Sequence, residues 1–185
     1  DIVLFNKKIK IVSLDTRFFK DDFTFNKDRS LNKKYIIDYD KNKTILGKEQ
    51  WQWLSNELSK KYNLFILLSS FQVLSTSHGW EKWNNFYYER NKLLKLLNQN
   101  PLSIILSGDR HFAGIYNYKN IYEITASSFN QKTFNIIEND DLRVGELIGK
   151  NNFGIIKIDE SNIEIKIVAS EGTTKEIFNS IKLKY

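Results

Sequence analysis

Two short runs of apolar residues constrain the fold of this chain more than any other feature. Residues 64–68 read LFILL and residues 102–106 read LSIIL, and neither run alternates regularly with polar residues. Strands covered on both faces have such continuous runs, whereas strands with one wet face alternate. The sequence therefore predicts two buried strands in a sheet that has a layer packed on each face.

A stretch with helical spacing precedes each of these predicted strands. Helices are expected at about residues 48–62 and 86–98, and Pro101 stops the second one. Their inward stripes comprise Trp51, Leu54 and Leu58 in the first helix and Arg90, Leu93, Leu94 and Leu97 in the second. Strands alternating with helices indicate an α/β fold.

The two ends of the chain differ from this central part. Strands are expected at residues 2–5 and 9–14, followed by a long polar excursion over residues 19–43. Beyond residue 121 the chain becomes β-rich, with alternating strands near residues 153–158, 163–169 and 180–184. This alternation predicts an antiparallel meander with one wet face.

Composition limits the classes of function. The absence of cysteine excludes disulfides, thiolate metal sites and a cysteine nucleophile within this chain. No apolar run approaches the roughly 20 residues that a membrane-spanning helix needs. The net charge of +6 comes from scattered lysines, which favours a lysine-rich composition over nucleic-acid binding. Because the chain has no methionine, we expect it to be processed or cut from something longer.

Three polar clusters follow three predicted strands. They occupy residues 15–17, 72–83 and 109–111. In open α/β sheets the chemistry lies beyond the carboxyl ends of the strands. We therefore expect the three clusters to face one crevice.

The cluster after residue 108 has the pattern Gly-Asp-x-His. On an extended segment, Asp109 and His111 point to the same side. A carboxylate and an imidazole suit a divalent or trivalent ion such as zinc, manganese or iron. The alternative is an ordinary strand-to-turn corner, with Asp109 as a cap and His111 in the core.

The other two clusters suggest substrate binding. The fork of Arg17 matches a phosphate or a carboxylate bidentately, unless it merely pairs with Asp15. Residues 72–83 combine aromatic and polar side chains as ligand pockets do, unless their tryptophans only cover the core. The stretch combines a His, a Glu and two tryptophans, and its composition alone assigns no individual roles.

In their order and spacing, these motifs resemble the PhoD-like (alkaline phosphatase D) phosphatases. The resemblance runs from about residue 8 to the end of the chain. It is carried by Leu14-Asp15-Thr16-Arg17, Leu46-Gly47 with Gln50-Trp51, Ser70-Phe71-Gln72-Val73-Leu74, His78-Gly79-x-Glu81-x-Trp83, Glu89-Arg90, Gly108-Asp109-Arg110-His111-Phe112 and Asn152-Phe153-Gly154.

The resemblance implies a metallophosphoesterase, with two sheets packed face to face and helices outside. It implies hydrolysis of phosphate monoesters, diesters or both by water activated on divalent or trivalent ions such as calcium, iron, zinc or manganese. Asp109 and His111 would be catalytic; Asp109 would be a metal ligand, and His111 would contact metal or the substrate phosphate. The residues expected to bind the substrate, or to line or support its pocket, are Arg17, Gln72, His78, Trp80 and Glu81.

One departure from the family pattern is large. The family's first metal-binding motifs normally precede the segment that resembles Leu14-Asp15-Thr16-Arg17, and only 14 residues lie before Asp15 here. We therefore expect residues 1–185 to be the C-terminal portion of a single catalytic domain. The isolated chain is expected to bind metal weakly and to turn over little. The alternative is a catalytically inactive binding or structural module derived from the same fold.

Overall fold

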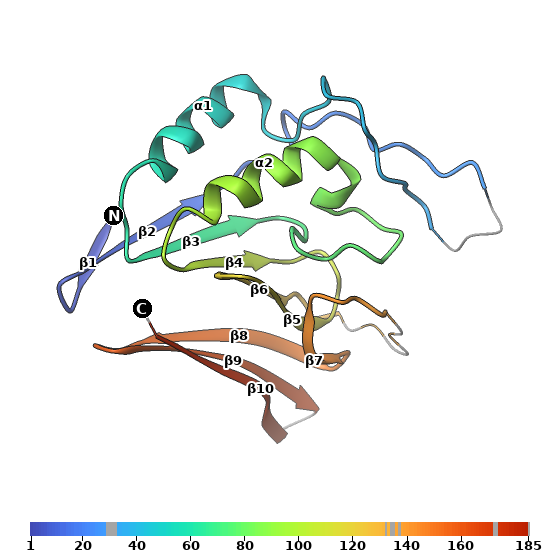
Figure 1. Ribbon diagram of the computed structural model, residues 1–185. Helices are drawn as coiled ribbons and strands as arrows, with labels where there is room; N and C mark the ends of the chain where they lie inside the picture. Colours follow the sequence, from blue (N-terminus) through green and yellow to red (C-terminus); the bar gives the residue numbers. More distant parts are fainter. Residues whose placement is uncertain (29–32, 132, 134–135, 137, 172–173, 185) are drawn as a thin grey trace.

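The protein is built as three layers around a seven-stranded mixed sheet. The computed structural model describes residues 1–28, 33–131, 133, 136, 138–171 and 174–184. Two helices cover one face of the large sheet, and a three-stranded antiparallel sheet covers the other (Figure 1). The prediction of an α/β fold with layers on both faces of the sheet is therefore confirmed. No helix in the described part of the chain is long and apolar enough to cross a membrane.

The large sheet has the strand order β1-β2-β3-β4-β6-β5-β7, and β2, β3, β4 and β6 run parallel. The small sheet has the order β10-β9-β8. The elements are β1 (Ile2–Leu4), β2 (Lys7–Ser13), α1 (Gly47–Leu58), β3 (Leu64–Ser69), a 3₁₀ turn (Trp83–Asn85), α2 (Tyr87–Leu97), β4 (Ser103–Ser107), β5 (Ala113–Tyr118), β6 (Ile121–Ala126), β7 (Arg143–Ile148), β8 (Asn151–Ile158), β9 (Asn162–Glu171) and β10 (Thr174–Lys184).

Strand β3 shows why the continuous apolar run forms a central strand. Phe65 and Leu67 point into the core beneath the helices, whereas Leu64 and Ile66 belong to the core shared with the small sheet. Successive side chains of a strand face opposite sides, so both sides of β3 must be apolar. All four residues are 5% exposed or less.

The small sheet is the antiparallel meander predicted from the alternating pattern. In β9, Ile163, Ile165 and Ile167 are fully buried against the large sheet. Glu164 and Lys166 alternate with them and form an ion pair at 2.8 Å on the wetter face. Burial on one face and charge on the other is what the period of two requires.

Strands β5 and β7 are absent from the sequence prediction. Strand β5 pairs with β6 on one side and with β7 on the other, both antiparallel. Strand β7 contains Gly145 and has mostly exposed or half-exposed side chains, so it carries no apolar signal. Its strand conformation depends on pairing with a partner more than 20 residues away, which local patterning does not reveal.

The polar excursion over residues 19–43 forms no helix or extended strand in its described part, as predicted. It is docked on the loop that follows β3, where the Tyr35 amide donates to the Gly79 carbonyl at 2.9 Å. A Cβ on Gly79 would lie 2.3 Å from the Cα of Lys33. Only glycine therefore permits this close approach of two backbones.

We predict that Gly79→Ala lowers the free energy of unfolding by about 1–3 kcal/mol, because one of the two backbones must move. Chemical denaturation measures the change. Gly154→Ala is the matched control, because its added Cβ meets no atom closer than 3.6 Å. Equal effects of the two substitutions would contradict the docking of the excursion on Gly79.

Candidate active site

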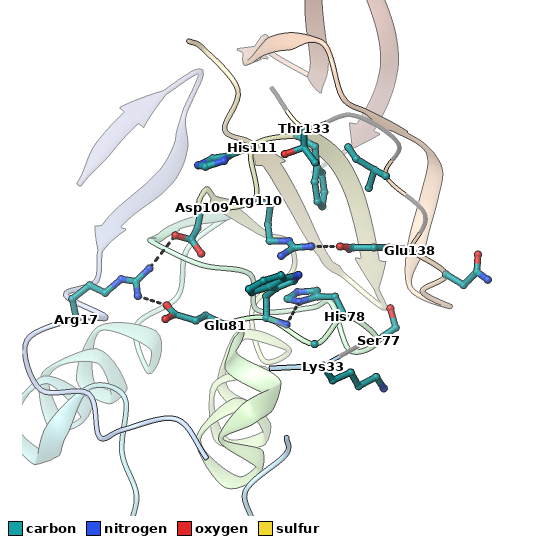
Figure 2. A pocket seen from close by; sticks show the side chains of 15 residues that line it. Arg17, Lys33, Ser77, His78, Glu81, Asp109, Arg110, His111, Thr133 and Glu138 are labelled. Carbon is teal, nitrogen blue, oxygen red and sulfur yellow. Dashed lines mark hydrogen bonds and ion pairs between the residues drawn. The ribbon is translucent and has the colours of Figure 1, made fainter. Parts of the chain in front are cut away.

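A cavity of about 860 Å³ lies beyond the carboxyl ends of the parallel strands. Its walls come from the segments that follow β2, β3 and β4, so the three polar clusters do face one crevice (Figure 2). Six of the seven residues predicted for the site line the cavity: Arg17, His78, Trp80, Glu81, Asp109 and His111.

Arg17 joins the three clusters through its guanidinium group. Its Nη1 donates to Glu81 Oε2, and its Nη2 lies 3.3 Å from Asp109 Oδ1 (Figure 2). The guanidinium carbon also lies 5.0 Å from the centroid of the Phe71 ring. Arg17 is therefore held between two carboxylates and against one aromatic ring.

The alternative pairing of Arg17 with the Asp15 carboxylate through their side chains is not found. The carboxylate of Asp15 instead accepts hydrogen bonds from the backbone amides of Arg17 and Phe18, each at 2.9 Å. These two amides, that of Phe18 first, lower the pKa of Asp15 below its usual value. Asp15 therefore shapes the turn that leaves β2, and the Arg17 side chain is left to face the cavity.

Asp109 and His111 both reach the cavity, but the segment that carries them is bent. Their φ angles are 72° and 55°, so the expected extended geometry is wrong. The turn is closed by the His111 amide, which donates to Ser127 Oγ at 3.0 Å, and by the Thr133 amide, which donates to the His111 carbonyl. Both Asp109 and His111 are exposed, so the alternative of His111 in the core is also wrong.

His78 is buried in the cavity wall and holds the backbone of Trp80. Its Nδ1 accepts a hydrogen bond from the Trp80 amide at 3.1 Å, which places the proton of the neutral ring on Nε2. Burial, followed by the charges of Arg110 and Lys82, lowers the pKa of His78 to about 2. His78 is thus a neutral ring whose Nε2 has no hydrogen-bond partner among the described residues.

Gln72 does not line the cavity, in contrast to the prediction. It is fully buried, and its side-chain amide donates to Thr125 Oγ1 at 2.9 Å. The two tryptophans of the same loop have different roles. Trp83 is buried and donates to Ser69 Oγ at 3.0 Å, whereas Trp80 is 52% exposed at the cavity. The loop is therefore partly a packed loop and partly a cavity wall.

Two buried charged side chains hold the start of this loop from opposite sides. Arg90 donates from Nε and Nη2 to the carbonyls of Val73 and Leu74, at 2.7 and 2.8 Å. Glu123 accepts from the amides of the same two residues, at 2.8 and 2.5 Å. Burial raises the pKa of Glu123, and the two amides oppose this shift. Neither side chain was predicted as a site residue, and neither touches the cavity.

A further wall of the cavity was not predicted. Arg110 and Glu138 form an ion pair in which both side chains are largely buried, and burial raises the pKa of Glu138. Asp140 does not line the cavity itself, but it accepts hydrogen bonds from the amides of Thr76 and Ser77, at 2.7 and 3.1 Å, and Ser77 does line it. Arg110 lies inside the Gly-Asp-x-His pattern, but nothing in the sequence marks Glu138 or Asp140.

The side chains present do not complete a metal centre. In the part of the chain that the structure describes, no three His, Cys, Asp or Glu side chains are grouped to hold a metal ion. Asp109 and His111 offer one oxygen and one nitrogen donor, and Arg17 already neutralises Asp109. Zinc sites in proteins, for example, use three or four protein ligands.

This arrangement defines an α/β protein with a crevice of charged side chains beyond its parallel strands. The profile of the PhoD-like phosphatases matches residues 5–152, and the chain belongs to that family.

Known proteins support the same assignment. Alkaline phosphatase D of Bacillus subtilis (strain 168) is 28% identical over 131 residues, which cover 62% of this chain and 21% of that protein. The structure of PhoD superposes with a TM-score of 0.74 at 17% identity, covering 97% of this chain and 40% of that one. GAP50, the anchor in the inner membrane complex of Plasmodium, has a TM-score of 0.61 at 18% identity, covering 74% and 42%. The match thus spans about a fifth of the length of this curated relative.

We predict that Arg90→Leu lowers the free energy of unfolding by about 2–5 kcal/mol, since it leaves the buried carbonyls of Val73 and Leu74 without the donors of Arg90. Lys95→Leu is the control, because Lys95 is exposed on the same helix and should change stability by about 0.5 kcal/mol or less. Denaturation with urea measures both. A small effect of Arg90→Leu would show that the loop is held by other contacts.

We predict that the contribution of His78 to the stability of the protein falls as the pH falls below about 6.5. The unfolded chain then binds a proton on His78, whereas the folded chain does not until the pH nears 2. The slope contributed by this residue is at most about 1.4 kcal/mol per pH unit. Urea denaturation between pH 5 and 7 measures it. His78→Gln should remove this contribution, and His111→Gln should retain it.

Proposed function

We propose that this chain forms part of the active site of a metal-dependent phosphoesterase that hydrolyses phosphate monoesters, diesters or both. One observation carries the proposal. Six side chains, drawn from three motifs of the PhoD-like family, meet in one cavity at the ends of parallel strands. In this proposal, residues 1–185 are the C-terminal portion of one catalytic domain of the metallophosphoesterase type.

The family resemblance suggests the roles of these residues, and their positions in the cavity support them. Asp109 and His111 contribute two metal donors, and residues outside these 185 supply the others. Metal ions such as calcium, iron, zinc or manganese, held in part by Asp109 and His111, would supply an activated water and would stabilise charge on the phosphoryl group. Arg17 offers a planar fork for the phosphate oxygens, and Glu81 orients that fork. Trp80, whose amide is bound by His78, presents its ring to the ester group.

An apolar surface at the edge of the large sheet supports the assignment to a larger domain. Strand β1 is an edge strand, and the side chains of Ile2, Val3 and Leu4 are 42%, 68% and 40% exposed. Ile11 of β2 is also 46% exposed. Native sheets seldom leave apolar edges uncovered. We propose that the remainder of the catalytic domain packs on this edge.

A second candidate function is a binding or structural module without catalysis. It is favoured by the ion pair between Arg17 and Asp109, which neutralises a proposed metal ligand. The likeness in fold to GAP50, which is described as an anchor, is compatible with it. Metal-dependent turnover in the complete protein separates the two functions.

The test is hydrolysis of p-nitrophenyl phosphate and bis-p-nitrophenyl phosphate in the presence of each proposed metal. We expect negligible turnover by the 185 residues alone, because metal donors are missing. We expect turnover by the product of the complete reading frame that encodes them. In that product Asp109→Ala should lower kcat/KM by about 100-fold or more.

Asp22→Ala is the control, because Asp22 is exposed and lies outside the cavity wall. Robust hydrolysis by the isolated chain would contradict the proposal that donors are missing. Metal binding without turnover in the complete protein would favour the binding module.

A further inference from the structure

Three buried polar atoms at one end of the cavity have no hydrogen-bond partner among the described residues. They are Nε2 of His78, Nε of Arg110 and Oε2 of Glu138. All three side chains line the cavity, and Figure 2 shows them on the side away from Arg17. Buried polar groups in native proteins are nearly always hydrogen-bonded, so three unpartnered atoms in one wall require an explanation.

The three atoms form a set of two donors and one acceptor. His78 carries its proton on Nε2, because Nδ1 accepts from the Trp80 amide at 3.1 Å. Nε of Arg110 is the second donor, and Oε2 of the Glu138 carboxylate is the acceptor. The ion pair between these two side chains uses Nη2 and Oε1 instead. The set is neutral overall, because the two charges of the ion pair cancel and the His78 ring is neutral.

This set of atoms selects among ligand chemistries. An ionised phosphate or carboxylate has no proton to donate to Glu138, and an apolar group leaves all three atoms unpartnered. A lactam edge, in which a ring carbonyl lies beside a ring N–H, matches every atom. Its oxygen accepts from both donors, and its N–H donates to the carboxylate. Hypoxanthine, guanine and uracil have this edge, whereas the ring nitrogen of adenine or cytosine accepts only one hydrogen bond.

An aromatic ring at the same cavity favours a planar ligand. Trp80 is 52% exposed there, and its backbone is fixed by His78 and by the packing of Gly79 on Lys33. Nucleobases stack on aromatic side chains, and hydrogen bonds to the base edge then add selectivity. A water molecule or a lone hydroxyl would satisfy the three buried atoms but would leave the Trp80 ring uncovered.

The three atoms are themselves buried in the wall, so a ring edge reaches them only when neighbouring side chains move. Side-chain rotamer changes are common when proteins bind their partners. The ion pair between Arg110 and Glu138 can persist during this movement, because the contacts to the ligand use its two other atoms.

We infer that this end of the cavity binds a nucleobase with a lactam edge, stacked on Trp80 and hydrogen-bonded at its edge by the three buried atoms. The inference rests on the proposed function only in making this base part of a phosphoester substrate. It deepens that function by naming nucleotides as the substrate class. The contacts that bind the base require no metal ion.

The test is titration of inosine into the 185-residue chain, followed by ¹H–¹⁵N NMR of the tryptophan indole groups. We expect a saturable shift of the Trp80 resonance and none of Trp53, which is 43% exposed on α1 and lies outside the cavity wall. Trp80→Ala should raise the Kd for inosine about tenfold, because the stacking contact is lost. Trp53→Ala is the matched control and should leave the Kd unchanged.

His78→Asn tests the contacts to the base edge. Asparagine offers an acceptor to the Trp80 amide at the place of Nδ1, but it has no donor at the place of Nε2. In the wild type, inosine should bind about fivefold more tightly than adenosine. This ratio should fall toward one in His78→Asn, whereas a purely structural effect would weaken both nucleosides alike. Thermal melts verify that each variant folds.

Two further ligands define the source of the edge. Uridine and cytidine are the pyrimidine pair that corresponds to inosine and adenosine, so they distinguish a pyrimidine ligand from a purine ligand. Ribose tests the sugar alone and should cause no saturable shift of Trp80.

The inference is overturned if neither inosine nor uridine gives a saturable shift of Trp80, or if ribose binds as tightly as they do. It is also overturned if His78→Asn leaves the preference for the lactam edge unchanged or weakens both members of a pair alike. Hydrolysis of p-nitrophenyl phosphate by the complete protein without nucleoside binding would support the proposed function and reject the base site. Nucleoside binding without hydrolysis would support the base site and reject the proposed function.

Discussion

The backbone of Val73 and Leu74 is held by Arg90 on its carbonyl side and by Glu123 on its amide side, and the candidate site depends on this contact. The two side chains come from α2 and β6, which lie on different layers of the fold. Charged side chains tolerate burial only when hydrogen bonds satisfy their polar atoms. The backbone of the loop provides those bonds. The contact therefore links α2 and β6 to the start of the loop that forms one wall of the cavity.

The cavity contains paired charges rather than a field of one sign. Arg17 is balanced by Glu81 and Asp109, and Arg110 is balanced by Glu138. The first group is open to solvent and the second is largely buried, so they respond differently to a ligand. Exposed pairs exchange partners at small cost, whereas breaking a buried pair strands a charge. One end of the cavity is therefore suited to binding ions, and the other is suited to keeping its shape.

The parts of the fold that depend on neighbouring residues were predictable. The apolar runs gave β3 and β4, the helical stripes gave α1 and α2, and the polar clusters at strand ends gave the place of the cavity. The errors concern long-range contacts. Gln72 faces the core because Thr125 lies behind it, and β7 exists because β5 pairs with it. Glu138 joins the cavity from 28 residues beyond Arg110, a separation that carries no local signal.

The contact between the polar excursion and the loop after β3 has an evolutionary consequence. The backbone of Lys33 lies directly on Gly79, and Lys33 forms part of the cavity rim. No strand of the large sheet pairs with the described part of this excursion. Insertions or deletions within residues 19–43 can therefore reshape the entrance without altering sheet register. Relatives of this chain can diverge in ligand preference through the length of one surface segment, while the residues beneath it remain the same.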